Sequence, residues 1–185
     1  MRPSVPLVPF SAADLAALRW IRAADSPVVF TLSSGEAPLA QLRWADRSGS
    51  LAHAETASAR WTLKRGGFLN PHVTIRTFDS EAELGRITVH FNHHLIEMAG
   101  GRTYRFHRAG ILVPAWQVTT EDRTELVHLE PVREGRKLNG GAVLVSPPGT
   151  QAHDLPALLA LTWYFIVLAW FEDEALVAFE GPDAP

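Results

Sequence analysis

The segment LPALLALTWYFIVLAWF, from Leu155 to Phe171, limits the possible folds more than any other part of the 185-residue chain. Asp154 stands before it as a helix N-cap, and Pro156 lies in the first turn, where a missing N–H costs little. Apolar side chains then cover every face of the predicted helix. A helix that is apolar all round is buried all round, so the rest of the chain has to supply its surroundings.

The chain before this segment has the sequence pattern of a β protein. From Val28 onward, short runs of β-branched and aromatic residues alternate with turn residues about every ten positions, as in a sandwich or barrel. Apolar residues alternate within these runs, for example Trp61 and Leu63, so each strand has one packed and one solvated face. Most connections are short, which favours antiparallel neighbours. The expected strands are 28–32, 39–44, 51–56, 60–64, 73–78, 84–91, 95–98, 102–107, 111–118, 126–130 and 141–145.

A short helix is expected near the N-terminus. Ser11 suits the N-cap, and Asp14 stands three residues later, at the capping-box position. Leu15, Leu18 and Ile21 then recur at helical spacing. The prolines of the lead-in MRPSVPLVPF would interrupt the apolar helix of a signal peptide, so no such peptide is expected.

Either lipid or protein can bury the helix at 155–171. A membrane span needs about 20 apolar residues and commonly has Lys or Arg on its cytoplasmic flank, whereas acids stand on both sides of this segment. A large β-barrel has room for a helix, which is about 10–12 Å across, and closure removes open sheet edges. We therefore predict a mainly β protein, an antiparallel closed β-barrel of about 12 strands around a buried hydrophobic C-terminal helix, plus a short N-terminal helix. A C-terminal membrane anchor is the alternative.

The length of the chain fits one domain, and its 46% hydrophobic residues are enough for a well-buried core. We expect an N-terminal extension with the short helix at 1–27 and the barrel at 28–179, including its central helix at 155–171. Residues 180–185 are expected to form a tail.

Three stretches of the chain, taken in order, resemble a known family. They are RWTLKRGGF at 60–68 with VTIR at 73–76, then GRTYRF at 101–106 with Trp116 beyond it, then LPALL at 155–159 with Trp163-Tyr164 and an acidic exit. Over roughly residues 28–175 the chain resembles small bacterial members of the tubby C-terminal-domain-like superfamily. That superfamily includes tubby proteins, phospholipid scramblases and LURP-one-related proteins.

This resemblance implies a barrel of about a dozen strands around a hydrophobic helix. Its functional implication is lipid-related: tubby domains bind phosphoinositides, scramblases are linked to lipid movement, and LURP-one proteins to plant defence. The calcium segment and the cysteine-rich stretch of scramblases have no counterpart in this chain, which lacks cysteine. No lipid-binding residue of tubby proteins is carried over.

Basic residues beside glycines suggest an anion-binding patch. Arg makes bidentate contacts with phosphate, and exposed glycine backbone cradles anions, as the pair Gly66-Gly67 would. The alternative is the solvated face of alternating strands. A second basic cluster is Arg133, Arg136 and Lys137. The candidate ligand-binding residues are Lys64, Arg65, Arg102, Arg105 and Arg108.

His90, His93 and His94 form the densest cluster of residues able to ligate a metal. On one strand His90 and His94 would share a face but lie roughly 13 Å apart, too far to hold one ion. A hairpin turn at Asn92-His93 would bring the rings closer. We expect surface histidines and no metal site, because few acids stand nearby and zinc geometry is demanding.

Composition narrows the function further. The absence of cysteine excludes disulfides, thiolate nucleophiles and Cys-based metal sites, and the net charge of -3 gives no global attraction to nucleic acid. No GxSxG, P-loop or HExxH motif is present. We expect a cytoplasmic, non-catalytic binding or scaffold module without a cofactor. Its ligand would be an anionic phospholipid headgroup, with peripheral membrane contact, or a phosphorylated molecule. A purely structural or protein-interaction module is the alternative, and the oligomeric state is open.

Placing a charge in the middle of the apolar segment tests its burial. The substitution Phe165→Asp is expected to abolish folding, because an isolated buried carboxylate costs several kcal/mol, about the whole stability of a domain. Circular dichroism and solubility measure the outcome. A soluble, folded Phe165→Asp protein would show that the barrel does not need this helix.

Overall fold

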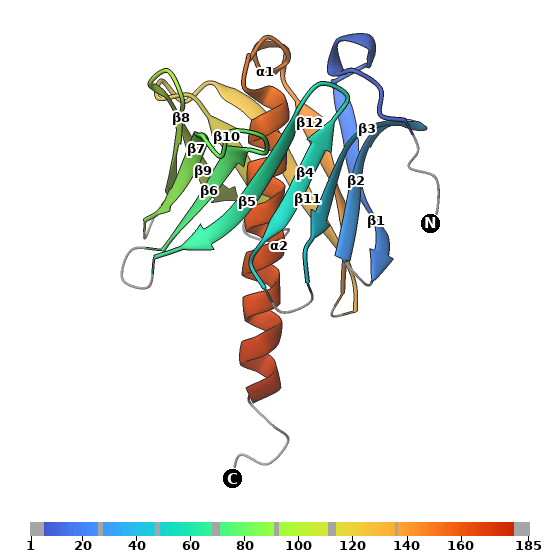
Figure 1. The fold of residues 1–185 in the computed structure, drawn as a ribbon, viewed down its shortest axis with the longest axis vertical. Helices are drawn as coiled ribbons and strands as arrows, with labels where there is room; N and C mark the ends of the chain where they lie inside the picture. The colour runs from blue at the N-terminus through green and yellow to red at the C-terminus, as the bar shows by residue number, and fades with distance from the viewer. Residues whose placement is uncertain are drawn as a thin grey trace.

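The computed structural model describes residues 6–25, 28–46, 49–67, 71–90, 93–110, 114–135 and 137–179. Within these ranges, the protein is mainly β, and twelve antiparallel strands form a closed barrel (Figure 1). Each strand pairs with its neighbours in the sequence, and the first strand closes the barrel against the last, as predicted from the alternation and the short connections. The strands are β1 (Ala17–Asp25), β2 (Val28–Ser34), β3 (Ala37–Trp44), β4 (Ala52–Thr56), β5 (Arg60–Gly66), β6 (His72–Thr77), β7 (Glu83–Val89), β8 (His94–Met98), β9 (Arg102–Ala109), β10 (Ala115–Thr119), β11 (Glu125–Glu134) and β12 (Lys137–Val145).

The short N-terminal helix predicted from Ser11 onward is wrong. A 3-10 turn, η1 (Phe10–Ala12), occupies its start, and β1 takes the rest. Leu18 and Trp20 are buried whereas Ile21 is 46% exposed, so burial follows the period of two of a strand. Pairing with both β2 and β12 satisfies the backbone of this segment and outweighs its local helical pattern. The barrel therefore includes residues 17–25, which were expected to lie in an extension.

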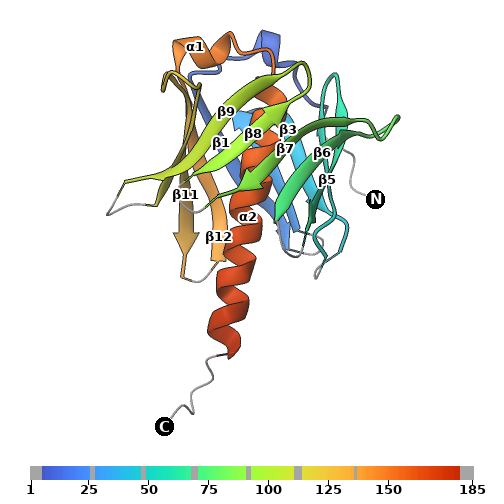
Figure 2. The same ribbon diagram turned by 90° about the vertical axis from the view of Figure 1, so that its left-hand side faces the viewer.

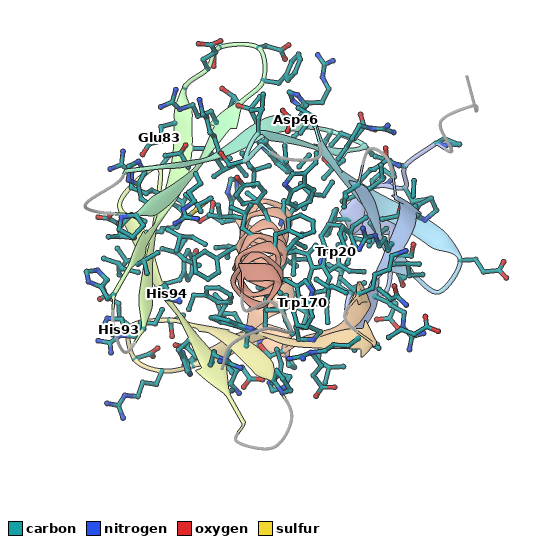
Figure 3. All side chains as sticks on the ribbon, turned by 90° about the horizontal axis from the view of Figure 1, so that it is seen from below. Trp20, Asp46, Glu83, His93, His94 and Trp170 are labelled. Atoms are coloured by element: carbon teal, nitrogen blue, oxygen red, sulfur yellow. The ribbon has the colours of Figure 1, made fainter. Side chains whose placement is uncertain are left out.

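Helix α2 (Leu155–Phe179) runs inside the ring of strands and leaves it at the end opposite α1 (Pro147–Thr150) (Figures 1 and 2). It continues past residue 171, where the sequence pattern ends it. Residues 176–179 belong to this helix as well. Seen along the helix in Figure 3, Trp20 and His94 lie on opposite sides of it.

Aromatic side chains of the barrel wall pack directly on α2. Trp163 stacks on Trp20 with ring centroids 5.7 Å apart, and it meets the edge of Phe30 at the same distance. Tyr164 stacks on Trp44 at 5.3 Å. Pairs of this kind contribute about 0.5–1.5 kcal/mol each beyond the area that they bury. The helix and the inward-facing side chains of the strands thus form a single hydrophobic core.

A charged network holds the start of α2 at the barrel entrance. Arg102 donates two hydrogen bonds to the carboxylate of Asp154, at 2.5 and 2.9 Å, and the Tyr104 hydroxyl donates a third at 3.0 Å. Burial alone would raise the pKa of the Asp154 carboxyl, but these hydrogen bonds and the charge of Arg102 outweigh it and lower the pKa. The carbonyl of Asp154 also accepts the N–H of Leu158 at 2.8 Å, which begins the helix.

Gly140 allows the strands that close the barrel to approach each other. Its φ is +149°, and a Cβ atom placed there would lie 2.1 Å from the carbonyl oxygen of Trp20. In the strand register Gly140 stands between Ile21 of β1 and Val132 of β11. Any side chain at this position would force β1 and β12 apart.

The substitution Gly140→Ala is therefore expected to lower the free energy of unfolding by about 2–4 kcal/mol, because a strand has to move. Urea unfolding followed by tryptophan fluorescence measures this loss. Gly35→Ala is the matched control. Gly35 has a φ of +56° and open space around it, so this substitution should lower the free energy of unfolding only by backbone strain, about 1–2 kcal/mol. Equal losses in the two variants would contradict the close approach.

Candidate anion-binding groove on strands β4 to β7

A hollow of about 440 Å³ lies on the outer face of strands β4, β5, β6 and β7, and we call it the β4–β7 groove. Trp61 and Leu63 of β5 are buried in the core, so the residues between and after them point outward. The same alternation applies in β6, where Val73 and Ile75 face the core. The strand register then aligns the outward side chains in two polar rows, His53–Thr62–Arg76 and Lys64–Thr74–Arg86.

The cations in the groove differ in their partners. Arg86 donates two hydrogen bonds to the carboxylate of Glu83, at 3.0 and 3.2 Å, and these bonds are the main reason that its pKa is raised. Lys64 and Arg76 also line the hollow, and neither forms a salt bridge with a described residue, although Glu81 lines the hollow as well. Ammonium, guanidinium and hydroxyl donors around one hollow are the groups that bind phosphate or carboxylate.

An apolar pocket of about 240 Å³ adjoins the groove where α2 leaves the barrel, and we call it the exit pocket. Phe165, Leu168 and Ala169 of α2 form one wall. Val73 and Val89 of β6 and β7, together with Pro71, form the other. Arg65 and His72 line both the exit pocket and the groove, so the two hollows meet at these residues.

The structure does not bring the five candidate residues from the sequence together. Lys64 and Arg65 line the β4–β7 groove, but β6, β7 and β8 separate their strand from β9, which carries the other three. Arg102 is bound to Asp154, and the Arg108 guanidinium lies 5.9 Å from the ring centre of Trp116. Arg105 is exposed on β9, opposite Thr119.

The sequence pattern missed Arg76 and Arg86 as partners of Lys64. Their alternation with buried residues placed them on the outer face, but only the strand register aligns them across β5, β6 and β7. In the second basic cluster, the Arg133 guanidinium lies 4.2 Å from the ring centre of Trp170, Lys137 is exposed, and Arg136 lies outside the described residues.

His94 faces the core, whereas His90 is exposed at the barrel rim. The His94 ring lies 4.7 Å from that of Phe165 and 5.8 Å from that of Trp116, and its Nδ1 has no hydrogen-bond partner among the described residues. Burial, followed by the charges of His93 and His90, lowers the pKa of His94 to about 4. In the described part of the chain, no group of three or more His, Asp or Glu side chains is placed to hold a metal ion.

Comparison of the chain with protein-family models, with curated proteins and with solved structures gives no match. The resemblance to the tubby-like superfamily therefore stays a prediction. Within the described ranges, no helix combines the length and the hydropathy that crossing a membrane requires.

The lowered pKa of His94 predicts a pH dependence of stability. The unfolded chain binds a proton at His94 below about pH 6.5, whereas the folded protein does so only below about pH 4. The free energy of unfolding should therefore fall as the pH drops through this window. Its slope against pH should correspond to the uptake of up to one proton on unfolding.

Urea unfolding at several pH values, compared between the protein and its His94→Leu variant, measures this contribution. The variant should lose less stability between pH 6.5 and pH 4, because it has no imidazole to protonate. His107→Leu on neighbouring β9 is the control for removing a histidine. An unchanged pH profile in His94→Leu would contradict the burial of a neutral ring.

Proposed function

We propose that the protein is a non-catalytic binding module that holds an anionic group in the β4–β7 groove, such as the phosphate of a phosphorylated ligand or of a lipid headgroup. One observation carries this proposal: Lys64 and Arg76 face the same hollow, beside the Thr62 and Thr74 positions, without a carboxylate partner among the described residues. Two such cations stabilise a bound anion through charge-assisted hydrogen bonds.

The distribution of charge over the two ends of the barrel supports this site. Exposed acids gather in the loops at the end where α2 begins, with the cations Arg60, Arg102 and Arg123 among them. Most exposed charges at the end where α2 leaves the barrel are cations, with the acids Asp46 and Glu134 also at that end. The local potential near the groove therefore attracts anions although the net charge is -3. The acids are Asp14, Glu36, Asp79, Glu81, Glu121 and Asp122, and the cations are Lys64, Arg65, Arg108, Arg133 and Lys137.

The arrangement of α2 within twelve strands supports a tubby-like fold as part of the proposal. Its likeness to a superfamily with lipid-related members favours a lipid headgroup as the source of the anion. On this proposal the protein works in the cytoplasm and makes peripheral contact with a membrane.

Exposed apolar side chains on the outer faces of β1, β11 and β12 favour protein interaction as a second function. Ile21 and Val132 flank Gly140 in the strand register and are 46% and 55% exposed. Leu144 on β12 is 48% exposed and lies on the same outer face, four residues after Gly140. Contiguous apolar side chains on an outer face are typical of contact surfaces when the patch is large.

Replacing both Lys64 and Arg76 with Gln tests the proposed groove. Each charge-assisted hydrogen bond that is lost should weaken binding of inorganic phosphate about tenfold to a hundredfold. Isothermal titration measures phosphate binding, and co-sedimentation measures binding to phosphatidylcholine vesicles with and without phosphatidic acid, at low and high salt.

The matched control is Arg19→Gln with Arg123→Gln, which removes the same charge from exposed positions outside the groove. The control should bind within about twofold of the unmodified protein, since surface charges far from a site are screened by salt. Equal losses in the two variants, or no binding of phosphate and of anionic vesicles at low salt, would contradict the proposal.

A further inference from the structure

We propose that the ligand is a single-chain anionic amphiphile, with its phosphate or carboxylate head in the β4–β7 groove and its hydrocarbon chain in the exit pocket. This inference rests on the proposed function, because it takes the groove as the site of the anionic head. It adds a tail, which the groove alone does not require.

The two hollows adjoin each other at the rim of the barrel, where Arg65 and His72 line both of them. Gly66 stands opposite His72 in the register, and the His72 ring packs against it: a Cβ atom at Gly66 would lie 3.0 Å from Nε2 of His72. A molecule longer than a headgroup would therefore extend from the groove toward α2 along Arg65 and the His72 ring.

The exit pocket offers apolar surface that no side chain in the described part of the chain covers. Leu158 and Leu161, deeper in the barrel, are fully buried, whereas Phe165, Leu168 and Ala169 are only half-buried. This change occurs because α2 leaves the barrel here, and the wall of β6 and β7 no longer closes around it (Figure 2). A hydrocarbon chain would cover these side chains and remove their surface from water.

The order of polar and apolar groups decides the chemistry of the ligand. The positive charges of Lys64 and Arg76 lie on the groove side and that of Arg65 lies at the junction, whereas apolar side chains dominate the pocket side. This complementarity fits a molecule with one anionic end and one apolar end, rather than an inorganic anion or a neutral hydrocarbon. The volume of about 240 Å³ leaves room for a hydrocarbon chain of several carbons.

Titration of the full-length protein with a series of alkyl phosphates tests the tail. Butyl, hexyl and octyl phosphate, kept below their micellar concentrations, should bind progressively tighter than inorganic phosphate. Each added methylene should increase the affinity about fourfold until the chain fills the pocket. Octanol has the same tail without a charge and should bind much more weakly than octyl phosphate.

Filling the pocket from the helix side should remove the dependence on chain length. In the Ala169→Phe variant, octyl phosphate should bind no tighter than butyl phosphate, while inorganic phosphate binds as before. Val89→Phe fills the same pocket from the barrel wall and replaces the first variant if its thermal unfolding shows a loss of fold. Ala57→Phe, at an exposed turn, is the control for adding an aromatic ring.

The results separate this inference from the proposed function. Equal affinity for all alkyl phosphates and inorganic phosphate, with the dependence on Lys64 and Arg76 retained, would overturn the tail and leave the groove intact. Octanol binding as tightly as octyl phosphate would overturn the anionic head and, with it, the proposed function.

A further comparison distinguishes the source of the amphiphile. Tighter binding of free octyl phosphate than of vesicles containing phosphatidic acid identifies a free amphiphile, and the reverse identifies a membrane lipid. A preference for free octyl phosphate supports the inference when Ala169→Phe weakens that binding and overturns it when Ala169→Phe has no effect. A preference for vesicles of phosphatidic acid, which has two chains, overturns the single-chain ligand.

Discussion

The burial of α2 by the inner faces of the strands is the interaction on which the rest of the structure depends. A helix that is apolar on every side cannot pack against one sheet, because its other sides would stay in water. Trp20, Trp44 and Phe30 reach it from neighbouring strands and make one core of barrel and helix. The Arg102–Asp154 pair then sets where the helix enters.

The same arrangement explains why the candidate site lies where it does. In β5 and β6 the apolar residues take the inward positions and polar residues take most of the outward ones, so the charged rows of these strands follow from core packing. Where α2 leaves the barrel, its apolar surface and these outer charges line two adjoining hollows. A site for a molecule with one charged and one apolar end thus arises at the rim, without a cleft between domains.

Prediction from sequence succeeded where a periodicity was repeated and failed where it was short. The alternation in residues 60–64 and 73–76 gave the correct strands and their buried faces. Leu15, Leu18 and Ile21 fit the helical period, whereas Leu18 and Trp20 fit the period of a strand, and the prediction chose the helix. The segment forms a strand because it pairs with both β2 and β12. These partners are distant in the chain or fixed by barrel closure, so no local pattern indicates them.

The sequence by itself determined the mainly β class and which side of each clearly alternating strand faces the core, because alternation is a property of consecutive residues. Only the tertiary structure decided which charges stand together. Lys64 and Arg65 were predicted with Arg102, Arg105 and Arg108, yet barrel order places three strands between the two groups. The register of β5, β6 and β7 instead aligns Lys64 with Arg86 and places Arg76 in the adjacent row, because hydrogen bonds between strands fix neighbours that are distant in the chain.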